Sequence, residues 1–139
     1  MEAMELHEAA ERGDLASVRT LVEQGADVEA QAADGKRPLH WAALQGHAEV
    51  VRTLVEYGAD VDAEGTDGVR PLHCASVRGH VMAVRILHLL GADIEAQAAD
   101  GRRPLHFAAA EGRVEAMRAL VELGADVDAS TSRARRPNV

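Results

Sequence analysis

Seven histidines and a single cysteine are the side chains in this chain whose types could support catalysis or metal binding. Four of them, His7, His40, His73 and His106, recur at a step of 33 residues. If the repeats stack, equivalent side chains lie about 8–10 Å apart, whereas two imidazoles that share a zinc ion must each lie about 2.0–2.1 Å from it. We therefore expect these histidines to order a turn by hydrogen bonding, with no metal site.

Cys74 follows His73 directly, which could suggest a thiol nucleophile beside its base. Adjacent residues on a helix point about 100° apart, so they make a poor catalytic pair. Cys74 also takes the position of Trp41 and Phe107 in the neighbouring repeats, which favours a packing role. The sequence contains no glycine-rich phosphate loop, HExxH, paired-cysteine or GxSxG motif. We expect no catalytic residue, no cofactor and no enzyme activity.

The charge is unevenly distributed along the 139 residues. The 12 Lys and Arg and the 23 Asp and Glu before residue 130 leave a net charge of −11, and three arginines follow in residues 130–139. Such an acidic body would repel nucleic acid and anionic lipid. One cysteine allows no intramolecular disulfide, and no apolar run reaches the about 18 residues of a membrane span. A cytoplasmic or nuclear protein is expected.

The elements that must position these side chains recur in a fixed order. Pro38 and its equivalents suit the first position of a helix, since proline fixes φ and lacks an N–H group. Gly46 and its equivalents then break this short helix. The apolar spacing of Val50, Val51 and Leu54 predicts a second helix, and a glycine such as Gly58 should end it. The equivalent residues are Pro71, Pro104, Gly13, Gly79, Gly112, Gly25, Gly91 and Gly124, and the glycines that close the turns are Gly35, Gly68 and Gly101. Gly65 alone lies outside these positions and suggests a looser second turn.

The repeated stretch Asp34-Gly35-Lys36-Arg37-Pro38-Leu39-His40-Trp41-Ala42-Ala43 returns twice, beginning at Asp67 and at Asp100. Its Pro-Leu-His-x-Ala core and 33-residue step resemble the ankyrin repeat. The resemblance implies an all-α repeat solenoid of helix-turn-helix pairs with projecting β-turn loops. We expect a capping repeat over 1–35, further repeats over 36–68, 69–101 and 102–129, and a disordered basic tail over 130–139.

The two ends of the array differ. Glu8 and Glu11 replace Trp41 and Leu44 in the first repeat, as expected where no repeat covers that face. The fourth repeat carries apolar residues of the internal type, such as Phe107, with no further repeat in the sequence to cover them. Its exposed end predicts fraying or self-association of an otherwise monomeric protein, or indicates a chain cut from a longer one.

The resemblance implies protein partners, bound through the turn tips and the inner face of the first helices. The candidate residues are Asp34, Lys36, Arg37, Leu44, Gln45, Tyr57, Asp67, Val69, Arg70, Val77, Arg78, Leu90, Asp100, Arg102, Arg103, Glu111 and Leu123. Within this set, the row Tyr57, Leu90 and Leu123, with Leu44 and Val77, suggests an exposed apolar patch. A second and less polar surface is indicated on the outer helix of the third repeat.

Arg37, Arg70 and Arg103 replace the threonine of the family signature, whose hydroxyl can cap the helix start. Two interpretations remain open. Each arginine pairs with a nearby aspartate (Asp34, Asp67 and Asp100, or Asp60, Asp93 and their equivalents), or the three form a ladder that grips acidic side chains of a partner. The sequence thus predicts a non-enzymatic protein-binding module. The alternative is a regulatory or anchoring fragment of a larger multidomain protein.

Overall fold

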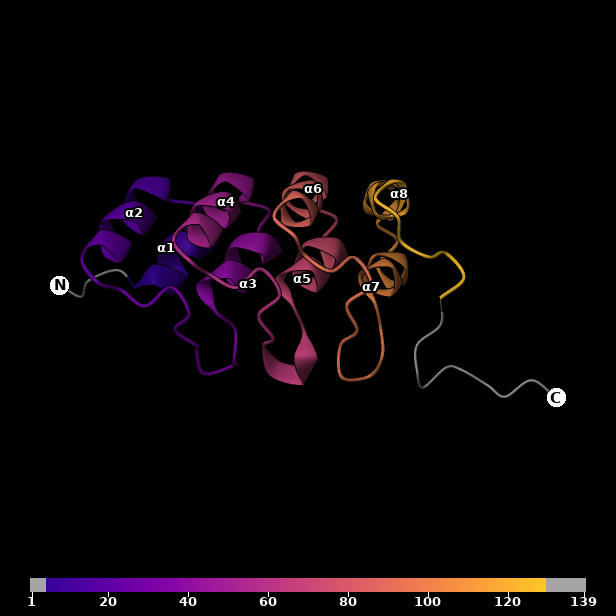
Figure 1. Ribbon diagram of the computed structural model, residues 1–139, viewed down its shortest axis with the longest axis horizontal. Coiled ribbons are helices and arrows are strands. Elements are labelled where there is room, and N and C mark those ends of the chain that lie inside the picture. Colours follow the sequence, from indigo (N-terminus) through magenta and orange to yellow (C-terminus); the bar gives the residue numbers. More distant parts are fainter. Residues whose placement is uncertain (1–4, 130–139) are drawn as a thin grey trace.

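The computed structural model describes residues 5–129, which form eight α-helices and one short 3-10 helix. The helices are α1 (Leu6–Arg12), α2 (Leu15–Glu23), α3 (Pro38–Leu44), α4 (Ala48–Glu56), η1 (Thr66–Gly68), α5 (Pro71–Val77), α6 (Val81–Leu89), α7 (Pro104–Ala110) and α8 (Val114–Glu122). Figure 1 shows them as four helix pairs stacked side by side, with the connecting turns projecting from one edge. The predicted all-α solenoid is confirmed, while the predicted tail, 130–139, lies outside the described residues.

Proline and glycine set the helix bounds as the sequence predicts. Helices α3, α5 and α7 begin at their prolines, whose missing N–H group would have had no partner in the first turn. Gly46 (φ 76°) and Gly58 (φ 106°) adopt the left-handed conformation after α3 and α4, where other residues are disfavoured. Each helix therefore stops where the next segment must turn.

The core lies between two layers of helices. Helices α1, α3, α5 and α7 pack against one another in sequence, and α2, α4, α6 and α8 do the same in a second layer. Leu39, Leu72, Leu54 and Leu87 are fully buried between these layers, and small alanines such as Ala42 let the helices approach closely. Each buried leucine contributes about 1.5–3 kcal/mol to folding through the hydrophobic effect.

At each junction between successive repeats, a side chain of one repeat packs on a glycine of the repeat before it. The ring of His47 lies over Gly13, and that of His80 lies over Gly46, so that a Cβ atom on either glycine would come within 2.6 Å of the ring. His47 Nε2 donates a hydrogen bond to Glu11 O (2.9 Å). Arg113 takes the same place at the last junction and donates to Val77 O (3.1 Å).

The outer helices depart from one sequence pattern. Arg118 and Glu122 are spaced for an i,i+4 pair, yet Arg118 pairs with Glu115 (3.6 Å). Glu122 instead accepts a bond from Arg85 of the preceding repeat (2.8 Å). Thus one ion pair of the outer layer joins α6 to α8. No helix within residues 5–129 is long and apolar enough to cross a membrane.

Candidate binding surface

Each motif histidine joins the first helix of its own pair to the segment that follows that pair. His73 Nδ1 accepts a hydrogen bond from the backbone N–H of Arg70 (2.9 Å), which leaves Nε2 protonated to donate to Ala96 O (2.8 Å). His106 makes the equivalent bonds with Arg103 N–H and Ala129 O, and His7 bonds to Ala30 O. His40 also accepts the N–H of the residue three positions earlier, Arg37, but its Nε2 donates to Val69 O, further along the turn. The predicted role in ordering turns is confirmed.

Burial favours the neutral form of two of these imidazoles, His40 and His73. Burial lowers the pKa of His73 from its ordinary value of 6.5 to about 4, and it also lowers the pKa of His40. Burial likewise raises the pKa of the Cys74 thiol to about 12, so the thiolate that a nucleophile requires is disfavoured. Cys74 is buried in the core cluster, as the packing interpretation predicts. Within residues 5–129, no three His, Cys, Asp or Glu side chains are grouped to hold a metal ion.

The three signature arginines pair with carboxylates that precede them in the same turn, but not with the aspartates that the sequence suggested. Arg37 lies 3.6 Å from Glu29, and Arg103 lies 3.5 Å from Glu95. Arg70 lies between Asp62 (3.9 Å) and Glu64 (3.7 Å). The aspartates at the turn tips lie elsewhere because each turn folds the acidic residue eight positions earlier against the arginine.

The same carboxylates bind the next repeat. Glu29 accepts the backbone N–H of Asp60 (2.9 Å), and Glu95 accepts that of Asp126 (3.1 Å). Asp62 accepts the N–H of Asp93 with both of its oxygens (3.3 and 3.2 Å). Each arginine therefore supports a charge-assisted bond across a repeat junction. We refer to Glu29, Asp62 and Glu95 as the junction carboxylates.

Two of the three turn tips carry a complete set of internal bonds. Asp34 accepts the backbone N–H of Lys36 (3.0 Å) and pairs with its ammonium group (3.3 Å). Asp100 makes the same two contacts with Arg102, at 3.0 and 2.8 Å. Both cations also lie over an aromatic ring, Lys36 at 5.5 Å from the Trp41 centroid and Arg102 at 4.3 Å from that of Phe107.

The middle turn is built differently. It contains η1, in which Asp67 takes a left-handed conformation (φ 61°), alone among the non-glycine residues 5–129. Its carboxylate has no hydrogen-bond or ion-pair partner within those residues. Thr66 donates its hydroxyl hydrogen to Asp34 O, and Asp67 O accepts the N–H of Ala99 (2.8 Å). The turn predicted to be looser is thus bonded to both neighbours.

Two hollows lie on either side of this middle turn. One hollow, of about 420 Å³, lies between the middle turn and the turn that bears Asp34, and its lining includes Lys36, His40 and Thr66. The other, of about 310 Å³, faces the fourth repeat and includes Arg102 and Phe107. Asp67 and Val69 line both hollows. The turn tips therefore form a ridged surface with the middle turn at its centre.

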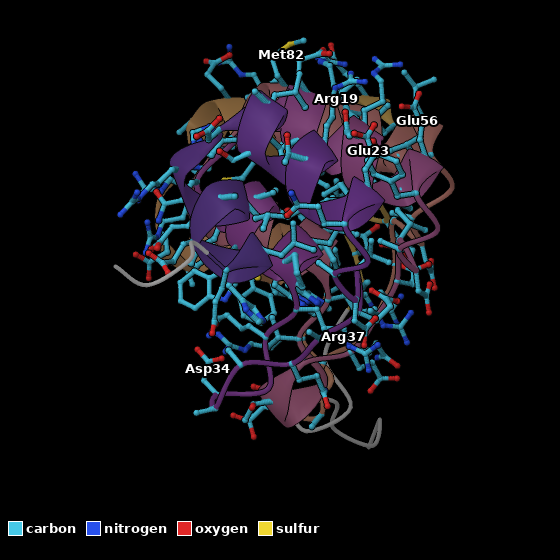
Figure 2. The ribbon with its side chains drawn as sticks, turned by 90° about the vertical axis from the view of Figure 1, so that its left-hand side faces the viewer. Arg19, Glu23, Asp34, Arg37, Glu56 and Met82 are labelled. Atoms are coloured by element: carbon cyan, nitrogen blue, oxygen red, sulfur yellow. The ribbon has the colours of Figure 1, made fainter. Side chains whose placement is uncertain are left out.

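The predicted apolar row of Tyr57, Leu90 and Leu123, with Leu44 and Val77, does not form an exposed patch. Leu44, Leu90 and Leu123 are half-buried and pack against the core, and Tyr57 and Val77 are also half-buried. Arg78 and Glu111 are exposed, and Gln45 is half-buried. Met82 and Leu89 of α6 have 63% and 76% of their surface accessible, and Val114 and Val121 of α8 and Val127 are also exposed. The less polar outer face indicated for the third repeat is confirmed, and Figure 2 shows Met82 at the edge opposite Asp34.

The end of the fourth repeat presents a groove of about 650 Å³ between α7, α8 and the segment that follows α8. Leu105, Met117, Val121 and Val127 line it with apolar groups. A Cβ atom added to Gly112, the equivalent of Gly46, would meet no atom of residues 5–129 within 4 Å. The predicted exposed end is therefore present.

A family model described as ankyrin repeats (3 copies) matches residues 6–98 and 66–131 of this chain. The two matched ranges overlap and together include all eight α-helices. No curated protein sequence matches the chain.

Proposed function

Because the chain belongs to the ankyrin repeat family, whose repeats are generally protein–protein interaction modules, we propose that it binds a protein partner through its turn tips and the inner face of its first helices. The observation that supports this proposal is the fixed array of charged tips. Asp34 and Asp100 are each held by bonds within their own turn, and the backbone of Asp67 is bonded to the next turn. The three turns project from the same edge of the stack.

Binding then follows from surface complementarity without a chemical step. The tips are ordered before a partner arrives, because the histidines tie each turn to its helix and the junction carboxylates tie each repeat to the next. The turn tips therefore lose little conformational freedom when a partner binds. Family membership gives the general class of function, and the proposal adds the face that is used.

The test compares two surfaces of the full chain. One variant carries Lys36→Glu and Arg102→Glu at the tips, and a matched variant carries Arg19→Glu and Arg52→Glu on the outer helices. Figure 2 shows Arg19 at the edge opposite the turn that bears Asp34. Proteins retained from cell extract by the immobilised wild type should be lost by the tip variant and kept by the outer variant. Equal retention by all three proteins would place the binding face elsewhere.

The groove at the end of α7 and α8 favours a second candidate, self-association of two copies through their fourth repeats. Val114 and Val121 are exposed there beside Met117, so pairing would remove apolar surface from water. Light scattering after gel filtration should then show a mass that rises with protein concentration for the wild type and stays monomeric for Val121→Glu. A concentration-independent monomer for both would exclude this second candidate.

A further inference from the structure

We propose that the Asp67 carboxylate is the point at which a basic side chain of the partner binds, with its aliphatic part against Val69. This inference rests on the proposed function of the turn tips and names the chemistry of the partner segment: a lysine or arginine in an exposed stretch of protein. The observation is that one tip of three lacks the internal cation and the internal N–H donor that neutralise the other two.

The comparison between equivalent tips carries the argument. Asp34 and Asp100 each accept two bonds from the residue two positions later, one from its N–H and one from its cationic group. For Asp67 that later residue is Val69, which has no charge. Its N–H is also directed elsewhere and donates to Thr66 O (3.3 Å). Asp67 therefore keeps all of its acceptor capacity for a group from outside.

The backbone explains why the N–H is lost as well as the cation. With Asp67 at φ 61° and ψ 24°, the turn closes as a single 3-10 turn from Thr66 to Val69. The extra Gly65 precedes this turn, and a Cβ atom there would lie 3.3 Å from His40 Nε2. The unusual residues Gly65, Thr66 and Val69 thus act together to present one carboxylate.

The surroundings fit a long basic side chain. The hollows on both sides of the turn are lined by Asp67 and by Val69, so a (CH₂)n stem can lie on Val69 while its head reaches the carboxylate. The neighbouring cations are neutralised, since Lys36 is paired with Asp34 and Arg102 with Asp100. What remains at the centre of the ridge is one negative charge on a body of net charge −11 before residue 130, which draws cations toward it.

The experiment uses the full chain and a random 12-residue peptide library displayed on phage, selected on the immobilised wild type. Selected peptides are then synthesised, and their affinity is measured by fluorescence anisotropy at low and high salt. Two variants remove the free carboxylate by different routes. Asp67→Asn removes the charge and keeps a residue that tolerates positive φ, and Val69→Lys supplies the internal cation that the other tips possess. Glu56→Gln, which removes one exposed carboxylate from the outer helix α4, is the matched control.

We expect the selected peptides to share a lysine or arginine beside an aliphatic residue. Asp67→Asn and Val69→Lys should each weaken binding by about five- to tenfold, as expected for loss of one charge-assisted bond to an exposed group. Glu56→Gln should change binding by less than about twofold. Replacing the basic residue of the peptide by glutamine should cost the same factor on the wild type and nothing further on Asp67→Asn.

Peptides that bind the tips without a basic residue, or that bind Asp67→Asn as well as the wild type, would overturn the inference and leave the proposed function standing. Peptides that are insensitive to the tip variant Lys36→Glu with Arg102→Glu would contradict the proposed function itself. A library that yields no binder to the folded chain would contradict both.

Discussion

At the scale of single residues, the glycines between paired helices can be tested against each other. Gly46 and Gly112 have similar backbone angles (φ 76° and 67°), but only Gly46 faces a histidine ring at contact distance. We expect Gly112→Ala to cost about 1 kcal/mol from the left-handed backbone alone. Gly46→Ala should cost about 1–3 kcal/mol more, because the ring of His80 must be displaced. Urea unfolding of the two variants measures the difference, and equal losses would show that the ring moves freely.

His73 should make stability depend on pH. Its pKa of about 4 in the folded chain lies below the ordinary value of 6.5, so the unfolded chain binds the proton more tightly. Stability is therefore fully present above pH 6.5 and declines as the pH falls toward 4. From pH 7 to pH 5 the loss due to this group is about 2 kcal/mol.

The pH dependence is checked by urea unfolding of the wild type and of His73→Gln at both pH values. The variant is expected to be less stable at pH 7 and to lose less between pH 7 and pH 5. His88→Gln is the control, since it removes a half-buried imidazole from α6 and leaves the bonds of His73 in place. An equal pH dependence in wild type and His73→Gln would contradict the assignment.

Residue identity predicted those histidine and glycine roles because each arises from the local chain or a fixed repeat step. It did not predict the partners of Arg37 and Arg103, because those depend on the path of the turn. The path brings Glu29 and Glu95, eight residues earlier, to the guanidinium groups. Nor did it indicate that Asp67 would be left-handed, since its equivalents Asp34 and Asp100 are not.

At the scale of elements, the junction carboxylates should contribute to stability more than surface ion pairs do. Glu95 has a side-chain accessibility of 28% and binds both Arg103 and the N–H of Asp126 through Oε2. We expect Glu95→Gln to destabilise the chain by about 1–2 kcal/mol, as for loss of charge-assisted bonds. The matched variant Glu115→Gln removes an exposed pair at 74% accessibility and should cost about 0–0.5 kcal/mol.

Urea midpoints for these two variants give the comparison. A loss for Glu95→Gln no larger than that for Glu115→Gln would mean that the turns hold the repeats together without the carboxylate.

Helix bounds were predictable from Pro38 and Gly46 and their equivalents, which act within a few residues. The bond from Arg85 to Glu122 was not, because it joins helices 37 positions apart, whereas the i,i+4 rule considers one helix alone.

At the scale of the molecule, the two ends should differ in local stability. Helix α1 turns Glu8 and Glu11 toward water, while α7 and α8 expose an apolar groove that no other helix of residues 5–129 covers. In hydrogen exchange we expect the amides of α8 to exchange about tenfold faster or more than those of α4, because opening the end repeat disrupts a single junction. Equal protection along the array would show that it opens as one unit.

The architecture as a whole was predictable because a 33-residue step and two sets of glycines allow few other folds. The exposed apolar surface was only partly predictable. Tyr57, Leu90 and Leu123 occupy positions that look open in the sequence, but they are half-buried, while Leu89 is exposed to solvent. Such coverage depends on the tilt between successive repeats, which the sequence pattern does not reveal.

The serial joining of repeats also has a mechanical consequence. Each junction is held by one carboxylate bond, one side chain over a glycine and a strip of buried leucine and alanine, and these are arranged one after another along the axis. A force applied to the two ends therefore passes through every junction in turn and cannot be shared among them. Under tension the chain should lengthen in steps of one 33-residue unit, beginning at the repeat with the weakest junction.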